Sequence, residues 1–147
     1  IRLKIQTKSS HKIHRSELLR LDFVNLNSWI AISIYIESSE LTDHAEKCVA
    51  SLNSLPDETI DDICRGLIKS AGEGGLDEEF ELPELDDVRD ILNFCRFTAV
   101  YVSKPEDDSI VSYVVEGEGD WGEVVGFVIK DGKAVYVGAD YLDCMNG

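Results

Sequence analysis

Alternating apolar and polar residues predict strands in the first quarter of the chain. Residues 1–5, IRLKI, alternate with the period of two that is typical of a half-exposed strand. Residues 17–26, ELLRLDFVNL, fit either a strand or a short irregular segment. Residues 28–38, SWIAISIYIES, are rich in β-branched and aromatic side chains, which favour strands. One face of that strand carries four isoleucines, and we expect it in the core: Ile30, Ile32, Ile34 and Ile36.

The apolar spacing then becomes helical in three consecutive blocks. Residues 41–55 predict a helix with Thr42 as its N-cap. Residues 56–72 predict a second helix, with Pro56 in its first turn and Gly72 at its end. Residues 83–95 predict a third helix that starts at Pro83. Three carboxylates are expected in its first turn, where the helix dipole favours negative charge: Glu84, Asp86 and Asp87.

The C-terminal part predicts strands again, at residues 97–103, 110–119 and 124–138. Asp131-Gly132 lies between two β-rich runs and predicts a two-residue type I′ hairpin turn that pairs Lys130 with Lys133. This order of elements predicts an α+β fold, with an antiparallel sheet, about three helices packed on one face and a C-terminal β-meander. The pattern shows neither repeat nor linker, so we expect a single domain over residues 1–147.

The composition is that of a globular protein, because 44% of the residues are hydrophobic. No apolar run reaches the roughly 18 residues that a membrane helix needs, and no signal peptide is visible. None of the four cysteines lies in a C-x-x-C pair, and all but the last fall on faces that we expect to be buried: Cys48, Cys64, Cys95 and Cys144. Cysteine used as a small hydrophobe is typical of reducing compartments, so we expect a cytoplasmic protein.

Charge narrows the class of partner. The net charge is −15, and it is unevenly placed: residues 1–20 hold six Lys or Arg against Glu17, a net of +5, so the remainder carries −20. A surface this negative repels phosphates and anionic lipids and attracts basic proteins. We therefore expect neither a nucleic-acid nor a membrane partner.

The sequence supports no catalytic, cofactor or metal site. His11 and His14 are three residues apart, but no nearby carboxylate or cysteine completes a zinc set, and a solvated polar segment is the simpler interpretation. His44 and Cys48 are one helical turn apart, yet Cys48 belongs to the apolar stripe of its helix, which favours core packing. No nucleophile elbow, phosphate-binding loop or EF-hand order is present. We expect a non-catalytic protein.

Two acidic concentrations remain. Residues 73–90 hold nine carboxylates against Arg89 alone, and residues 106–123 hold seven with no basic residue. Solvation alone is one interpretation. A basic protein partner is the other, because clustered carboxylates attract a cationic surface over long distances. The candidate partner-binding residues are Asp77, Glu78, Glu79, Glu81, Glu84, Asp86 and Asp87, with Asp120, Trp121 and Glu123 as a secondary set. Trp121 fits an interface anchor and a ring at the edge of the core equally well.

The closing segment GDWGEVVGFVIKDGKAVYVG, together with the order of elements, resembles small acidic immunity proteins of bacterial contact-dependent growth-inhibition and polymorphic toxin systems. The matching residues are Asp120, Trp121, Gly126, Asp131, Gly132, Val137 and Gly138. That group commonly has Glu-His before the first strand glycine, where this chain has Val124-Val125. The resemblance implies a protein that binds a cognate toxin, often a basic RNase or DNase, and occludes its active site or substrate surface.

Three functions follow for testing. The first is the immunity protein. The second is a non-catalytic acidic interaction or regulatory module, an adaptor or a nucleic-acid mimic, with an unknown basic partner. A mimic is expected to present its carboxylates at regular spacing along an elongated surface. The third is an enzyme of an unrecognised class, which requires His44 or a cysteine exposed in a pocket beside an oriented partner.

Overall fold

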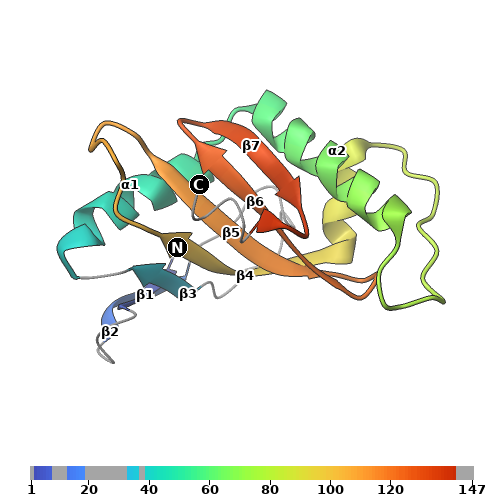
Figure 1. Ribbon diagram of the computed structural model, residues 1–147, viewed down its shortest axis with the longest axis horizontal. Helices are drawn as coiled ribbons and strands as arrows, with labels where there is room; N and C mark the ends of the chain where they lie inside the picture. Colours follow the sequence, from blue (N-terminus) through green and yellow to red (C-terminus); the bar gives the residue numbers. More distant parts are fainter. Residues whose placement is uncertain (1, 8–12, 19–32, 37–38, 142–147) are drawn as a thin grey trace.

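The computed structural model describes residues 2–7, 13–18, 33–36 and 39–141, which form one sheet and the helices that cover one of its faces (Figure 1). The strands are β1 (Arg2–Thr7), β2 (Ile13–Leu18), β3 (Ser33–Ile36), β4 (Cys95–Val102), β5 (Ser112–Gly119), β6 (Glu123–Lys130) and β7 (Lys133–Gly138). The helices are α1 (Thr42–Asn53) and α2 (Asp57–Glu73), with short 3-10 helices η1 (Ser39–Leu41) and η2 (Val88–Phe94). The fold is α+β, as the sequence predicts.

The sheet is mixed, with the strand order β2-β1-β3-β4-β5-β6-β7. From β4 to β7 all neighbours are antiparallel, which confirms the C-terminal meander. The pairs β1–β3 and β3–β4 are parallel, which the expectation of an antiparallel sheet did not include. A parallel pair needs a long crossover connection, and α1 and α2 lie in the crossover between β3 and β4.

Local patterns are confirmed where one short segment decides the structure. Asp131 and Gly132 both have positive φ, 51° and 79°, as a type I′ turn requires, and Lys130 pairs with Lys133. Ile34 and Ile36 are fully buried, as expected for the isoleucine face. Ile30 and Ile32 lie outside the described residues, as does most of the segment 17–26.

The predicted third helix is wrong in its start and its type. Residues 83–87 are not helical, and η2 begins only at Val88. Asp87 is the N-cap in an extended conformation, and its carboxylate accepts the N–H of Arg89 at 2.9 Å. The Asp90 carboxylate accepts the N–H of Asp87 at 3.2 Å, which completes a capping box at this point. Glu84, Asp86 and Asp87 therefore precede the helix instead of forming its first turn.

The ends of α1 and α2 also differ from the prediction. Leu41 is the N-cap of α1 without a side-chain hydrogen bond, while the Thr42 hydroxyl donates to the Ser39 carbonyl at 2.8 Å. Pro56 is the N-cap of α2 instead of a first-turn residue. Helix α2 continues past Gly72 to Glu73, and Gly74 ends it with φ of 83°. Only glycine adopts that backbone conformation without cost.

One hydrophobic core lies between the helices and the sheet face that they cover. Its largest fully buried side chains are Trp121, Phe97 and Phe127. A second, smaller cluster lies on strand positions of the opposite face, where Val114 and Val128 pack with Tyr141. Within the described part of the chain, no helix is long and apolar enough to cross a membrane.

The cysteines that the structure describes are free thiols that pack as small hydrophobes. Cys48 and Cys64 are buried and Cys95 is half-buried. Burial raises the pKa of each of these thiols to about 12, so they stay protonated and unreactive at neutral pH. Cys144 lies outside the described residues.

Candidate functional site

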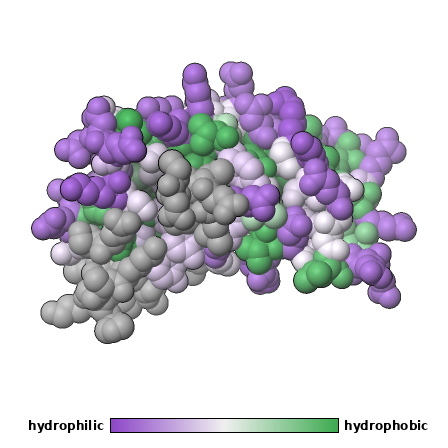
Figure 2. Space-filling view, in the orientation of Figure 1, coloured by the Kyte–Doolittle hydropathy of each residue, from purple (hydrophilic) through white to green (hydrophobic). Residues whose placement is uncertain are grey.

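The connection from α2 to η2, residues 74–87, forms an acidic segment at one end of the sheet (Figure 1, right). All seven carboxylates of the primary candidate set lie in it and all are exposed: Asp77, Glu78, Glu79, Glu81, Glu84, Asp86 and Asp87. Figure 2 shows hydrophilic side chains projecting at this end of the molecule, with hydrophobic residues between them. The sequence-predicted carboxylates therefore occupy one connected stretch of surface.

Backbone hydrogen bonds fasten the acidic segment to the β5–β6 turn. The N–H of Leu76 donates to the Gly122 carbonyl at 3.3 Å, and the N–H of Asp77 donates to the Trp121 carbonyl at 3.1 Å. Two glycines permit this approach. A Cβ on Gly75 would lie 2.3 Å from the Trp121 carbonyl oxygen, and a Cβ on Gly122 would lie 2.7 Å from the Asp77 nitrogen.

An aromatic contact fixes the middle of the segment. The half-buried ring of Phe80 packs edge-on against Phe94 and tilted against Trp121, with both centroid separations at 6.0 Å. The neighbouring carboxylates of Glu79 and Glu81 point into solvent. A segment anchored in this way loses less conformational freedom on binding than a free loop does.

Trp121 itself is fully buried. The burial of Trp121 contradicts the interpretation as an interface anchor and agrees better with the alternative, a ring at the edge of the core. Its Nε1 donates to a carboxylate oxygen of Glu123 at 3.4 Å, and the Ser70 hydroxyl donates to the same oxygen at 2.8 Å. Glu123 is half-buried and serves as an internal acceptor, which makes it a poor candidate for partner contact.

Asp120 is the one member of the secondary set that joins the surface. It is exposed, and its N–H donates to the Phe94 carbonyl at 2.8 Å, which holds the turn beside η2. The same β5–β6 turn also accepts the N–H of Asp77, which lies more than forty residues earlier in the chain. We call the seven carboxylates of the acidic segment together with Asp120 the acidic surface.

The second acidic concentration of the sequence is not one surface. Glu106, Asp107 and Asp108 lie in the β4–β5 connection, at the opposite end of the strands from Asp120. Glu116 lies within β5 and accepts hydrogen bonds from two tyrosine hydroxyls, Tyr141 at 2.6 Å and Tyr101 at 3.3 Å. Acids that are close in sequence lie far apart here because strand β5 runs between them from one end of the sheet to the other. A count of acids along the sequence does not reveal this separation.

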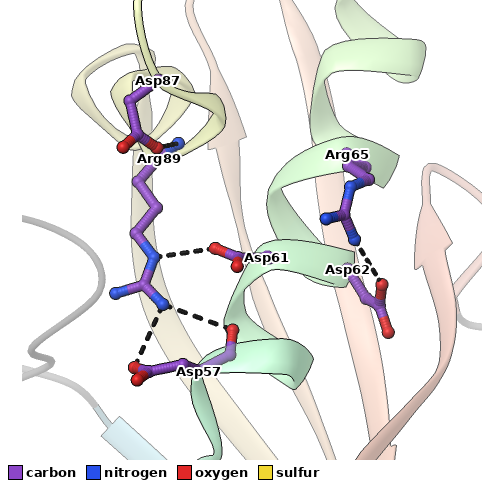
Figure 3. A network of polar contacts seen from close by, with 6 residues as sticks. All are labelled: Asp57, Asp61, Asp62, Arg65, Asp87 and Arg89. Atoms are coloured by element: carbon purple, nitrogen blue, oxygen red, sulfur yellow. Dashed lines mark hydrogen bonds and ion pairs between the residues drawn. The ribbon is translucent and has the colours of Figure 1, made fainter.

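Arg89, the one basic residue in the first acidic concentration, is engaged elsewhere (Figure 3). Its guanidinium contacts Asp61 at 2.9 Å and Asp57 at 3.1 Å, both on α2. These hydrogen bonds raise the pKa of Arg89 and tie η2 to α2. The arginine thus balances acids of α2 and leaves the carboxylates of the acidic segment uncompensated by it.

One feature of the acidic segment was missed by sequence reasoning. Leu76, between Gly75 and Asp77, is 91% exposed. A large apolar side chain in full contact with water beside a carboxylate cluster is available to a partner surface. The only signal in the sequence is a leucine within a glycine and acid run, which periodicity does not assign to any core face.

The residues considered for catalysis do not form a working pair. The Cys48 thiol is buried and donates to the Ser112 carbonyl at 3.6 Å. The His44 Nε2 is buried without a hydrogen-bond partner. Among the residues that the structure describes, no group of three or more His, Cys, Asp or Glu is arranged to hold a metal ion. His11 lies outside them.

His44 predicts a pH dependence of stability. Burial, with the Lys47 charge as a smaller cause, lowers the pKa of His44 below its usual 6.5, against an opposing effect of Asp108. The unfolded chain therefore binds the proton more readily, and folding stability falls as the pH drops from 6.5 through the lower folded pKa. Urea unfolding at pH 7.5 and 5.5 is expected to show a larger acid loss for the natural chain than for His44→Gln. An equal loss would contradict this role.

Comparison with known proteins places the chain in a family. The chain belongs to the family described as "Domain of unknown function (DUF6985)", which it matches over residues 6–144. No curated protein matches the chain, and no solved structure does.

Proposed function

We propose that this member of the DUF6985 family is an immunity protein that binds a cognate basic nuclease toxin through the acidic surface and blocks its active site or substrate surface. The observation that carries the proposal is the anchoring of the acidic segment. Its seven exposed carboxylates are held by the contacts of Leu76 and Asp77 with the β5–β6 turn, and by the packing of the half-buried Phe80 against Trp121.

The anchored carboxylates favour a basic partner for a physical reason. In a chain of net charge −15, they add a local concentration of negative charge that steers a cationic protein into place. Because the segment is already ordered by the core, little conformational entropy is lost when a partner binds. A solvated surface needs no such anchoring, so the anchoring supports a binding role over solubility alone.

Inhibition of a nuclease follows from the chemistry of such partners. A nuclease holds the phosphate backbone with lysine and arginine side chains, and carboxylates fit the same positions. The resemblance to immunity proteins supports this partner class. Its matching residues have structural roles here: Trp121 fills the core, and Asp131 and Gly132 make the hairpin turn. In this proposal the partner is therefore contacted by the exposed carboxylates of the acidic surface.

The arrangement of the acids favours the inhibitor over a nucleic-acid mimic. A mimic is expected to present carboxylates at regular spacing along an elongated surface. Here the longest acidic stretch is gathered in one loop at one end of the sheet, and Glu106, Asp107 and Asp108 lie at the other (Figure 1).

The test is capture of the partner followed by a charge-neutral variant. The tagged chain is exposed to a lysate of its own organism at low salt, and proteins released by rising salt are identified. One stoichiometric basic nuclease is expected, and adding the chain should stop its cleavage of RNA or DNA. The variant Glu78→Gln, Glu79→Gln, Glu81→Gln, Glu84→Gln is expected to slow association about tenfold or more and to weaken its salt dependence.

A matched variant controls for net charge. The control removes an equal number of charges, four, from exposed positions outside the acidic surface: Glu40→Gln, Asp43→Asn, Glu106→Gln and Asp108→Asn. This control is expected to change association far less, since the carboxylates of the acidic segment remain. If the two variants slow association equally, the acidic segment contributes only through the net charge of the chain and is not a specific binding surface. If the captured protein has no nuclease activity, the proposal of a nuclease toxin as the partner is wrong.

A further inference from the structure

A cleft of about 470 Å³ lies between the C-terminal half of α1, the connection from α1 to α2, Val111 just before β5, and the turn that joins β6 to β7. Because β5 and β6 each run from one end of the sheet to the other, this cleft is at the end opposite the β5–β6 turn and the acidic surface. Its volume falls within the range of small-molecule sites, roughly 300–1,000 Å³. The cleft is shallow and largely open to solvent.

A fixed carboxylate stands at one rim of the cleft. Asp131 is exposed, and one of its carboxylate oxygens, Oδ1, accepts the N–H of Val111 at 3.0 Å. The N–H of Asp131 donates in return to the Val111 carbonyl at 2.8 Å. These two hydrogen bonds hold the carboxylate in place and leave Oδ2 for a ligand. Asparagine suits the first position of a type I′ turn as well, so the turn does not require this charge.

A cation and a hydroxyl stand on the α1 side. Lys47 is exposed and lines the cleft, and its ammonium stands at the end of a flexible four-carbon stem. Ser51 lines the cleft one helical turn later, and its hydroxyl shares a hydrogen bond of 3.0 Å with the buried hydroxyl of Tyr113. Two hydroxyls carry two protons and share only one hydrogen bond, so this pair has donor capacity to spare.

Part of the cleft lining is apolar. Leu55, Pro56 and Val111 contribute to it, and Leu55 is only 8% exposed. An apolar surface in the same cleft as one carboxylate and one ammonium matches a small zwitterion that carries a hydrocarbon group. We propose that the cleft binds a free α-amino acid with an apolar side chain.

Each part of such a ligand has a counterpart. The ligand ammonium binds Oδ2 of Asp131, and the ligand carboxylate binds the Lys47 ammonium and the Ser51 hydroxyl. The hydrocarbon side chain covers Leu55 and Val111, which removes apolar area from water. This binding site is independent of the proposed toxin surface, because it uses different residues at the other end of the sheet.

The test is a titration of the full chain with l-leucine, followed by the amide signals in two-dimensional NMR. Saturable shifts are expected at Ser51, Val111 and Gly132, with a dissociation constant in the millimolar range or below. Two analogues separate the charges: 4-methylpentanoate lacks the ammonium and isopentylamine lacks the carboxylate. Each is expected to bind about tenfold more weakly than leucine, a loss that corresponds to one lost charged contact.

Variants that keep the fold complete the test. Asp131→Asn preserves the acceptor for Val111 and the turn, and Lys47→Met preserves the apolar stem. Each is expected to weaken leucine binding about tenfold, whereas Lys69→Met and Asp140→Asn, exposed and outside the cleft lining, leave it unchanged. The proposal is overturned if leucine causes no shift at the cleft, if the analogues bind as well as leucine, or if the cleft variants bind it normally.

Discussion

Replacing Trp121 by alanine is expected to lower the free energy of unfolding by about 3–5 kcal/mol, the usual cost of removing a large aromatic side chain from a core. Trp121 is fully buried and is among the largest such side chains of the chain. Its ring contacts Phe80 and lies against Gly119, where an added Cβ would be 2.5 Å from ring carbons. Urea unfolding followed by far-UV circular dichroism measures the loss without relying on tryptophan fluorescence.

Trp121→Phe is the matched variant. It keeps an aromatic ring in the core but removes the Nε1 donor to Glu123, so its loss is expected to be clearly smaller than that of the alanine variant. The alanine variant also removes the ring on which Phe80 packs, so the acidic segment should exchange its amide hydrogens faster. A loss in the alanine variant below about 1 kcal/mol, the average for any substitution, would contradict the core position.

The parts of the fold that the sequence predicts correctly are those that local chemistry decides. The Asp131-Gly132 turn needs only two residues with positive φ, and both flanking runs favour strands. The buried face of β3 follows from isoleucines at alternate positions. The parallel pairings of β3 depend on which distant strands lie beside it. The residues of β3 do not indicate which strands these are or in which direction they run.

The prediction of the third helix was wrong because the sequence contains two helix-start signals within a few residues. Pro83 followed by acids is typical of a first helical turn. Asp87 and Asp90 form a capping box three residues apart, and that box, with hydrogen bonds of 2.9 and 3.2 Å, sets the actual start. Because Cys95 already belongs to β4, only seven residues remain for the helix, which is too short for a stable α-helix of its own.

The candidate site was predictable in its charge and not in its assembly. Net charge along the chain identifies the carboxylates of the acidic segment, because exposed acids need no particular partner. A tryptophan beside acids is compatible with a core and with an interface, and only the packing of Phe80 and Phe94 around it decides. The contact of Asp77 with the β5–β6 turn is made by backbone groups, which carry no side-chain signal. The only sequence feature related to this contact is the presence of a glycine in each segment, Gly75 and Gly122.

Gly75→Ala is expected to detach the acidic segment from the β5–β6 turn. The added Cβ would lie 2.3 Å from the carbonyl oxygen of Trp121, which is a backbone atom and cannot rotate away. Overpacking of this kind costs about 1–3 kcal/mol when the structure must shift to relieve it. The amides of Leu76 and Asp77, which donate to the turn, are expected to exchange with deuterium faster in the variant. Association with a basic partner should slow as well, since the carboxylates lose their fixed positions.

Gly72→Ala makes the same chemical change three residues earlier and is expected to act in the opposite direction. A Cβ there meets no atom within 4 Å, and Gly72 lies in the last turn of α2. Alanine is better than glycine in a helix by up to about 1 kcal/mol, so this variant should be as stable as the natural chain or more so. Its Leu76 and Asp77 amides should exchange at the natural rate. If both variants leave that exchange and the partner association unchanged, the anchoring of the acidic segment is not what makes the acidic surface a binding site.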